Sequence, residues 1–151
     1  MPVYFEDIVE GHVASFGRYE VTREEVIEFA SRYDPQAFHL DDEAAADSIF
    51  GRLAASGWHT ASMAMRMIVD YWKETGRAET SKGGLGMEDL RWQRPVHPGD
   101  VLRVEIEVLE KRESRSRPDI GIIRSRWNVF NQHDEVVMTV ISNGIVARRP
   151  G

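Results

Sequence analysis

The stretch GWHTASMAMRMIVDYWKET, residues 57–75, carries the longest helical pattern in the chain. Its apolar side chains recur at steps of three and four residues, which is the period of one face of an α-helix. They are Trp58, Ala61, Met65, Ile68, Val69 and Trp72. Small or apolar residues also occupy most of the remaining surface, so the pattern predicts a helix that other structure wraps on most sides. Ser56 stands at its N-cap position and Gly76 at its C′ position.

After this helix the sequence changes from a helical period to an alternating one. Apolar and charged residues alternate between residues 102 and 108, which is typical of a strand with one solvated face. Further strands are predicted at residues 85–93, 120–131 and 135–148, with a short hairpin connection at 132–134. Strands that follow one buried helix predict an α+β fold, in which an antiparallel sheet curls around that helix.

Two shorter helices are predicted before the long one. The segment 22–25, Thr-Arg-Glu-Glu, is a capping box that starts a helix. That helix ends at Asp34, because a residue before proline avoids the helical region. A second helix is predicted over residues 43–47, with Asp41 or Asp42 as its N-cap.

Length and composition restrict the class of protein. The 151 residues are 42% hydrophobic and 29% charged, which predicts one domain covering residues 1–151. The formal net charge of -6, without a basic cluster, argues against nucleic acid as a partner. The absence of cysteine excludes disulfides and favours a reducing compartment. No signal peptide and no apolar run of about 20 residues is found, so we expect a cytoplasmic protein without a membrane partner.

The candidate catalytic groups lie between the two short helices. Asp34 and His39 occupy a polar turn in which no regular hydrogen-bond ladder holds the backbone. A carboxylate and an imidazole that converge on one water molecule can perform acid–base chemistry. The same residue types also serve as a backbone cap and a surface histidine, so the spacing alone leaves both interpretations open.

The segment 33–45, YDPQAFHLDDEAA, resembles the hydratase motif of the MaoC-like, R-specific enoyl-CoA hydratase family. That motif is written Gly-Asp-x-Asn-Pro-aliphatic-His-x5-Ala/Ser. The segments 55–60 and 91–100 and the later alternating strands agree with the same family. The resemblance covers roughly residues 18–148, and it implies a hot-dog fold, an antiparallel sheet wrapped around one long central helix.

The resemblance implies that Asp34 and His39 are catalytic, because both positions of the motif are intact. The sequence departs from the motif at Tyr33, Gln36, Ala37 and Phe38. Gln36 keeps an amide that can hydrogen-bond, and Phe38 adds bulk near the expected acyl site, so both are predicted substrate contacts. These departures bear on the identity of the substrate more than on the type of reaction.

The start of the long helix is the second candidate for chemistry. The first amides of a helix have no intrahelical acceptor, and Gly57 lets an acyl group approach the backbone closely. The Gly57 amide is therefore a candidate donor to a thioester oxygen as negative charge develops, and the family resemblance places an oxyanion donor here. Ser56 and Trp58 are predicted substrate contacts beside it. An ordinary serine cap followed by a flexible glycine is the alternative interpretation.

No metal and no redox cofactor is expected. His39 lies near Asp41 and Asp42, but it is the one nitrogen ligand available locally. The remaining histidines, His12, His59, His97 and His133, lie in other segments. His59 is assigned no catalytic role, because a first-turn histidine commonly bonds a neighbouring loop.

Three functions are compatible with these patterns. The first is a lyase that reversibly hydrates a trans-2-enoyl thioester or dehydrates a 3-hydroxyacyl thioester, with coenzyme A implied as the carrier by the resemblance. The second is thioester hydrolysis, because hot-dog thioesterases polarise the same carbonyl at the same helix entrance. The third is a non-catalytic module that binds an acyl thioester.

A homodimer is expected, with active sites between the chains. A sheet of about five strands has two open edges, and pairing with a second copy covers one of them. The related hot-dog hydratases dimerise, and the resemblance implies an acyl tunnel at that junction. Charged side chains on an edge strand are the alternative protection.

Overall fold

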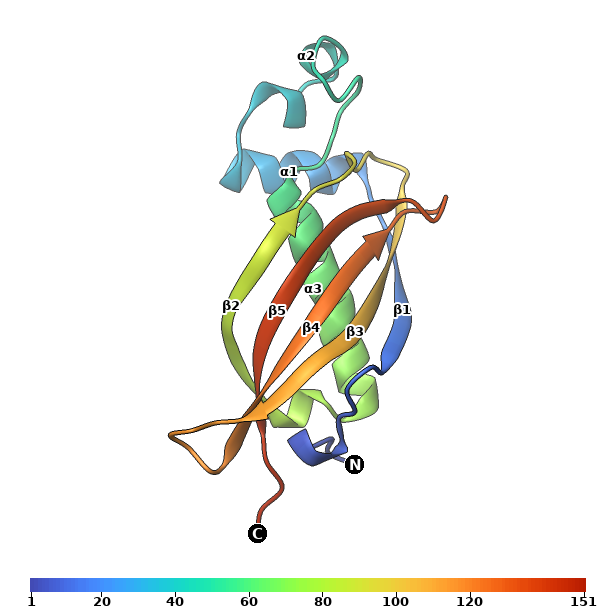
Figure 1. The fold of residues 1–151 in the computed structure, drawn as a ribbon. Helices are drawn as coiled ribbons and strands as arrows, with labels where there is room; N and C mark the ends of the chain where they lie inside the picture. The colour runs from blue at the N-terminus through green and yellow to red at the C-terminus, as the bar shows by residue number, and fades with distance from the viewer.

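The computed structural model describes residues 1–151, and its central feature is a long helix, α3, lying in the hollow of a curved five-stranded sheet (Figure 1). Three α-helices are present: α1 (Arg23–Tyr33), α2 (Asp42–Ala46) and α3 (Gly57–Thr75). The strands are β1 (Val13–Glu20), β2 (Ser81–Arg91), β3 (Val101–Glu113), β4 (Ile120–Phe130) and β5 (Val136–Ala147). Single 3-10 turns cover Phe5–Asp7, Ala37–His39 and Ala78–Thr80. No helix combines the length and the apolar character needed to cross a membrane.

Helix α3 begins and ends where the sequence predicts. Gly76 follows it with a φ of 88°, the left-handed conformation that glycine adopts without steric cost. The buried residues of α3 are His59, Thr60, Met63, Ala64, Met67 and Ile68. A narrow stripe that includes Trp58 and Arg66 stays exposed, so the helix is covered on most sides.

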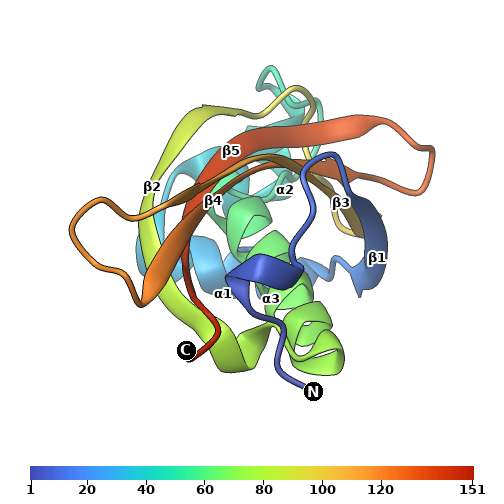
Figure 2. The ribbon, with the colours of Figure 1, turned by 60° about the horizontal axis from the view of Figure 1, so that its bottom comes forward.

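The sheet order is β1-β3-β4-β5-β2, and every neighbouring pair is antiparallel. Figure 2 shows the sheet curving around α3, with β1 and β2 on opposite sides of the helix. Alternate residues of β3, including Leu102 and Val104, are fully buried against it. The predicted antiparallel sheet around a central helix is confirmed.

Strand β1 is not among the predicted strands. Its sequence, VASFGRYE, has a weak alternation, and Gly17 interrupts it with a φ of 87° close to a shift in the pairing with β3. A Cβ at Gly17 would lie 2.6 Å from the sulfur of Met67, so β1 approaches α3 closely at this point. The glycine that weakens the strand signal is therefore the residue that lets the sheet meet the helix.

The predicted capping box at the start of α1 forms only in part. The Thr22 side chain accepts a hydrogen bond from the Glu25 amide at 3.2 Å, as expected. The Glu25 carboxylate turns away from the cap and instead accepts bonds from Tyr19 and His59. Helix α2 is capped by Asp41, whose side chain accepts from the Ala44 amide. Figure 1 shows α1 and α2 gathered at the N-terminal end of α3, while both chain termini lie at its other end.

Candidate active site

Asp34 and His39 converge at the N-terminal end of α3. Asp34 ends α1, where the following proline stops the helix, and His39 ends the 3-10 turn Ala37–His39. Asp34 Oδ2 lies 3.4 Å from His39 Nε2, and the two side chains are 18% and 6% exposed. The short segment between α1 and α2 thus holds a carboxylate and an imidazole face to face in a mostly buried position.

Two side chains hold the Asp34 carboxylate. Gln36 Nε2 donates to Oδ1 at 2.6 Å, and Ser56 Oγ donates to Oδ2 at 2.8 Å. Burial raises the pKa of Asp34, but the bonds from Gln36 and Ser56 and the charge of His39 outweigh it and lower the pKa below its usual value. Asp34 is therefore ionised at neutral pH and can accept a proton.

The ring of His39 is oriented by the backbone. Its Nδ1 lies 2.7 Å from the carbonyl oxygen of Ala54, and because a carbonyl only accepts, Nδ1 carries a proton. In the neutral ring the Nε2 atom, which faces Asp34, is then free to accept a proton. The rings of Phe38 and Phe50 pack beside the imidazole at centroid distances of 4.6 and 5.8 Å. Phe38 therefore contacts the candidate base directly.

Ser56 occupies the N-cap position of α3, but its side chain does not cap the helix. Its hydroxyl donates to Asp34 instead, which corrects the prediction of a conventional serine cap. The amides of Gly57 and Trp58 have no acceptor within the chain. A 19-residue helix thus presents free N–H groups, and the positive end of its dipole, beside Asp34 and His39.

The indole of Trp92 covers Gly57. A Cβ built at Gly57 would lie 2.3 Å from an atom of this ring, which is far inside van der Waals contact. Trp58 packs edge to face on Trp92 at 5.2 Å, and both rings are about half exposed. No hydrogen bond or ring contact joins Trp58 to Asp34 or His39. The ring of Trp58 contacts Trp92 instead. Trp92 was not among the predicted site residues, because nothing local in the sequence connects residue 92 with residue 57.

A second polar network lies one turn further along α3. His59, which is 3% exposed, has its Nε2 3.1 Å from Glu25 Oε1, and the same carboxylate accepts from the Tyr19 hydroxyl. Burial and the Glu25 carboxylate together raise the pKa of Tyr19 to about 12. The hydrogen bond expected between His59 and a neighbouring loop forms instead with Glu25 of helix α1. Tyr19 and Glu25 were missed as members, because Glu25 fits a capping pattern and Tyr19 belongs to the unpredicted strand.

Comparison with known proteins identifies close similarities over nearly the whole chain. The family model described as "MaoC like domain" matches residues 5–123. The structure of a MaoC-like dehydratase from Rhodospirillum rubrum is 42% identical and superposes with a TM-score of 0.87, covering 98% of this chain and 99% of that one. An R-hydratase from Pseudomonas aeruginosa is 25% identical with a TM-score of 0.72, covering 99% of this chain and 88% of that one. The 3-hydroxybutyryl-CoA dehydratase of Methylorubrum extorquens is 28% identical over 116 residues, which is 76% of this chain and 69% of that protein.

These similarities agree with the architecture described above. The chain superposes on the Rhodospirillum rubrum dehydratase with a TM-score of 0.87, and with a TM-score of 0.71 on a Mycobacterium tuberculosis protein described as having a double hot-dog fold, so the predicted hot-dog fold is confirmed. The roles of the individual site residues stay predictions. These are the catalytic roles of Asp34, His39 and Gly57 and the substrate contacts of Gln36, Phe38, Ser56 and Trp58.

Proposed function

Because the chain belongs to the MaoC-like dehydratase family, we propose that it is a hydro-lyase for acyl thioesters, folded as one hot-dog domain over residues 1–151. In this proposal it adds water reversibly to a trans-2-enoyl thioester, or removes water from a 3-hydroxyacyl thioester. The observation that carries the proposal is the 3.4 Å approach of Asp34 to His39 beside the free amide of Gly57.

The proposed proton transfers use both members of the pair. A water molecule held by Asp34 Oδ2 and His39 Nε2 adds its oxygen to Cβ of the enoyl group while the pair accepts one of its protons. A proton is returned from the pair to Cα, so the enzyme ends the cycle as it began. Ser56 and Gln36 keep the carboxylate in place, and the Ala54 carbonyl keeps Nε2 directed toward it.

The start of α3 is proposed to stabilise the negative charge that develops during the reaction. As water adds to Cβ, negative charge develops on the thioester oxygen. A backbone N–H aimed at that oxygen stabilises the charge without having to reorganise. The Gly57 amide is the proposed donor, since it lacks an intrachain acceptor. Glycine adds no side chain of its own beside that amide, and the ring of Trp92 occupies the space that a Cβ would take.

Coenzyme A is the proposed carrier of the acyl group. Support comes from the name of the relative in Methylorubrum extorquens, a 3-hydroxybutyryl-CoA dehydratase, and from the R-hydratase similarity. The departures at Gln36 and Phe38 lie at the Asp34 carboxylate and at the His39 ring, respectively. We therefore propose that they adjust the acyl group that is accepted and leave the reaction type unchanged.

An assay of the purified protein against a panel of enoyl-CoA and 3-hydroxyacyl-CoA thioesters tests this function. We expect the absorbance of the conjugated double bond to fall on hydration and to rise on dehydration, while free thiol stays constant. Release of thiol at a rate equal to or above the loss of the double bond would identify a thioesterase instead. No change in either signal over the whole panel would favour a non-catalytic binding module.

We also propose a homodimer, and the structure supports it at strand β2. This strand forms one edge of the sheet, and most of its residues are exposed, including Leu85 and Met87 at 58% and 55%. An unpaired strand edge that exposes apolar side chains invites a second strand. We expect light scattering behind gel filtration to give twice the 17.3 kDa mass of the chain. An active monomer at micromolar concentration would contradict the proposal.

A further inference from the structure

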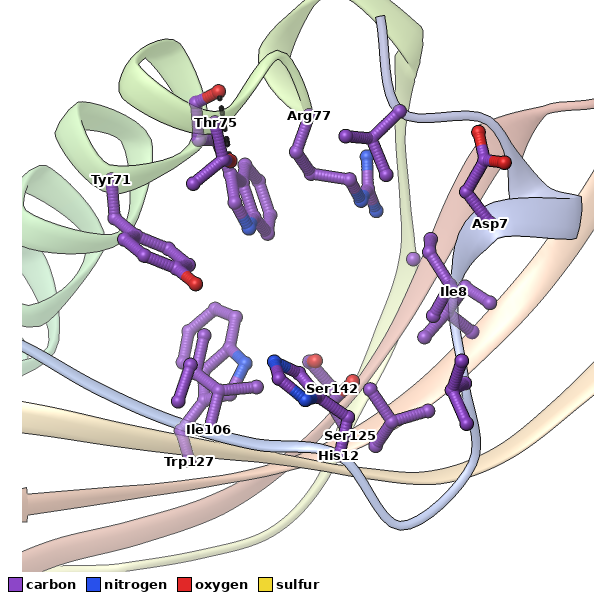
Figure 3. Close-up of a pocket in the computed structure, with 17 residues that line it drawn as sticks. Asp7, Ile8, His12, Tyr71, Thr75, Arg77, Ile106, Ser125, Trp127 and Ser142 are labelled. Atoms are coloured by element: carbon purple, nitrogen blue, oxygen red, sulfur yellow. Dashed lines mark hydrogen bonds between the residues drawn. The ribbon is translucent and has the colours of Figure 1, made fainter.

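A cavity of about 440 Å³ lies at the opposite end of α3 from the candidate active site. It is bounded by the last turn of the helix, the concave face of the sheet and the N-terminal segment (Figure 3). Tyr71 on its wall stands about 21 Å along the helix axis from Gly57, at about 1.5 Å per residue. The cavity is therefore separate from the Asp34–His39 site, and its size falls within the range of about 300–1,000 Å³ of small-molecule sites.

Most of the cavity wall is apolar. Ile8, Ile106, Val108 and Ile123 contribute aliphatic surface, and Trp72 and Trp127 contribute aromatic surface. Such a wall suits a hydrocarbon group, because burying CH₂ groups against it removes apolar surface from water. Figure 3 shows His12, Ser125 and Ser142 on the side of the cavity away from Arg77, and Tyr71 on the helix.

Arg77 brings an unpaired positive charge to this wall. Its Nη1 is buried and has no hydrogen-bond partner, and no carboxylate lies within ion-pair distance of the guanidinium. The guanidinium carbon lies 4.7 Å from the centroid of the Trp72 ring, in a cation–π contact. Asp7 is the one carboxylate in the lining, and it is already bonded to the Tyr4 amide and to Arg149.

This charge is costly in the free protein. Burial lowers the pKa of Arg77 to about 10, so the group stays protonated at neutral pH while the surroundings disfavour its charge. Buried polar groups of folded proteins are generally hydrogen-bonded, and a buried ion generally has a counter-ion. An apolar cavity with one free guanidinium nitrogen is thus complementary to an anion that carries an apolar tail.

We propose that the Arg77 cavity binds a small monocarboxylate, with its carboxylate on the guanidinium of Arg77 and its hydrocarbon tail along the apolar wall. A carboxylate matches the planar donor fork of arginine. Its single charge also equals that of the one free cation, whereas a phosphate monoester carries about -1.5 to -2 charges at neutral pH and would leave charge uncompensated. The site is independent of the proposed hydro-lyase activity.

Calorimetric titration of the purified protein with octanoate tests the proposal, with octanamide as the neutral ligand of the same shape. We expect octanoate to bind the unmodified protein and octanamide to bind at least about tenfold more weakly, since a hydrogen bond between two charged groups is stronger than one to a neutral amide. Arg77→Met should weaken octanoate binding by a similar factor. Arg66→Met, which removes an exposed arginine on α3, is the matched control and should leave binding unchanged.

The remaining outcomes decide where the ligand lies. Octanoate binding that Asp34→Asn leaves intact supports the separate site, whereas binding abolished by Asp34→Asn would place the ligand at the candidate active site and overturn the proposal. Absence of octanoate binding, or equal affinity for octanoate and octanamide, would also overturn it. The comparison of the two ligands uses the unmodified protein, so it holds even if Arg77→Met does not fold.

Discussion

Asp34→Asn and His39→Gln should each lower the turnover of the preferred enoyl-CoA thioester by about 10² or more. Asparagine keeps the shape of Asp34 and its bond from Ser56, but its amide cannot take a proton from water. Glutamine keeps a polar group near the Ala54 carbonyl, but it offers no titratable nitrogen toward Asp34. The measurement is kcat from the loss of the conjugated double bond, with the melting temperature of each variant as the check on folding.

Matched controls exist elsewhere in the chain for both substitutions. His97 also directs Nδ1 at a backbone carbonyl, that of Leu53 at 2.8 Å, but it has no carboxylate opposite its other nitrogen. His97→Gln should therefore keep turnover close to that of the unmodified protein. Asp41→Asn, at the N-cap of α2, should do the same. Near-normal hydration by the Asp34 or the His39 variant would refute the acid–base assignment.

Gly57→Ala should lower turnover by a similar factor of about 10², for a steric reason. The new Cβ would lie 2.3 Å from the Trp92 ring, so either the indole or the first turn of α3 must move. A displacement of about 1 Å at a positioned catalytic group can cost about 10²-fold in rate. The readout is kcat together with KM, because a displaced oxyanion donor acts mainly on kcat.

Removing the obstruction distinguishes the clash from the loss of glycine itself. The double variant Gly57→Ala with Trp92→Leu should recover a large part of the lost turnover, while Trp92→Leu alone should fold and react nearly normally. Unaltered turnover in Gly57→Ala would mean that the start of α3 does not need its present geometry. A double variant no faster than Gly57→Ala would show that the clash with Trp92 is not the cause.

The same Ser56 hydroxyl connects the two parts of the proposed site. It gives up the capping role that the sequence predicts and bonds Asp34, so α3 and the turn that carries His39 are joined at one carboxylate. This leaves the helix amides without an internal acceptor at the place where an acyl oxygen is proposed to sit. A serine hydroxyl has one donor and two acceptor sites. In this fold the donor bonds Asp34, and no amide of the helix donates to the hydroxyl.

The local sequence was sufficient to predict α3 and four of the five strands. Hydrophobic periodicity depends on which face of an element is buried, and that information is written in neighbouring residues. The end of α3 at Gly76 and the start of α1 at Thr22 were also predictable, since caps depend on backbone conformation within one turn. The strand β1 was not, because Gly17 breaks its alternation for the sake of a contact with Met67 on α3.

The sequence by itself determined the nature of the chemical groups at the candidate site, namely Asp34, His39 and the Gly57 amide. Only the tertiary structure decided how they are held, through the bond of Ser56 to Asp34 across 22 positions and that of His39 to Ala54 across 15. It also decided that Arg77 lines a cavity without a counter-ion. The physical reason is that a hydrogen bond or an ion pair depends on which groups packing brings within about 3 Å, whereas residue type and periodicity specify only which face of each element is buried.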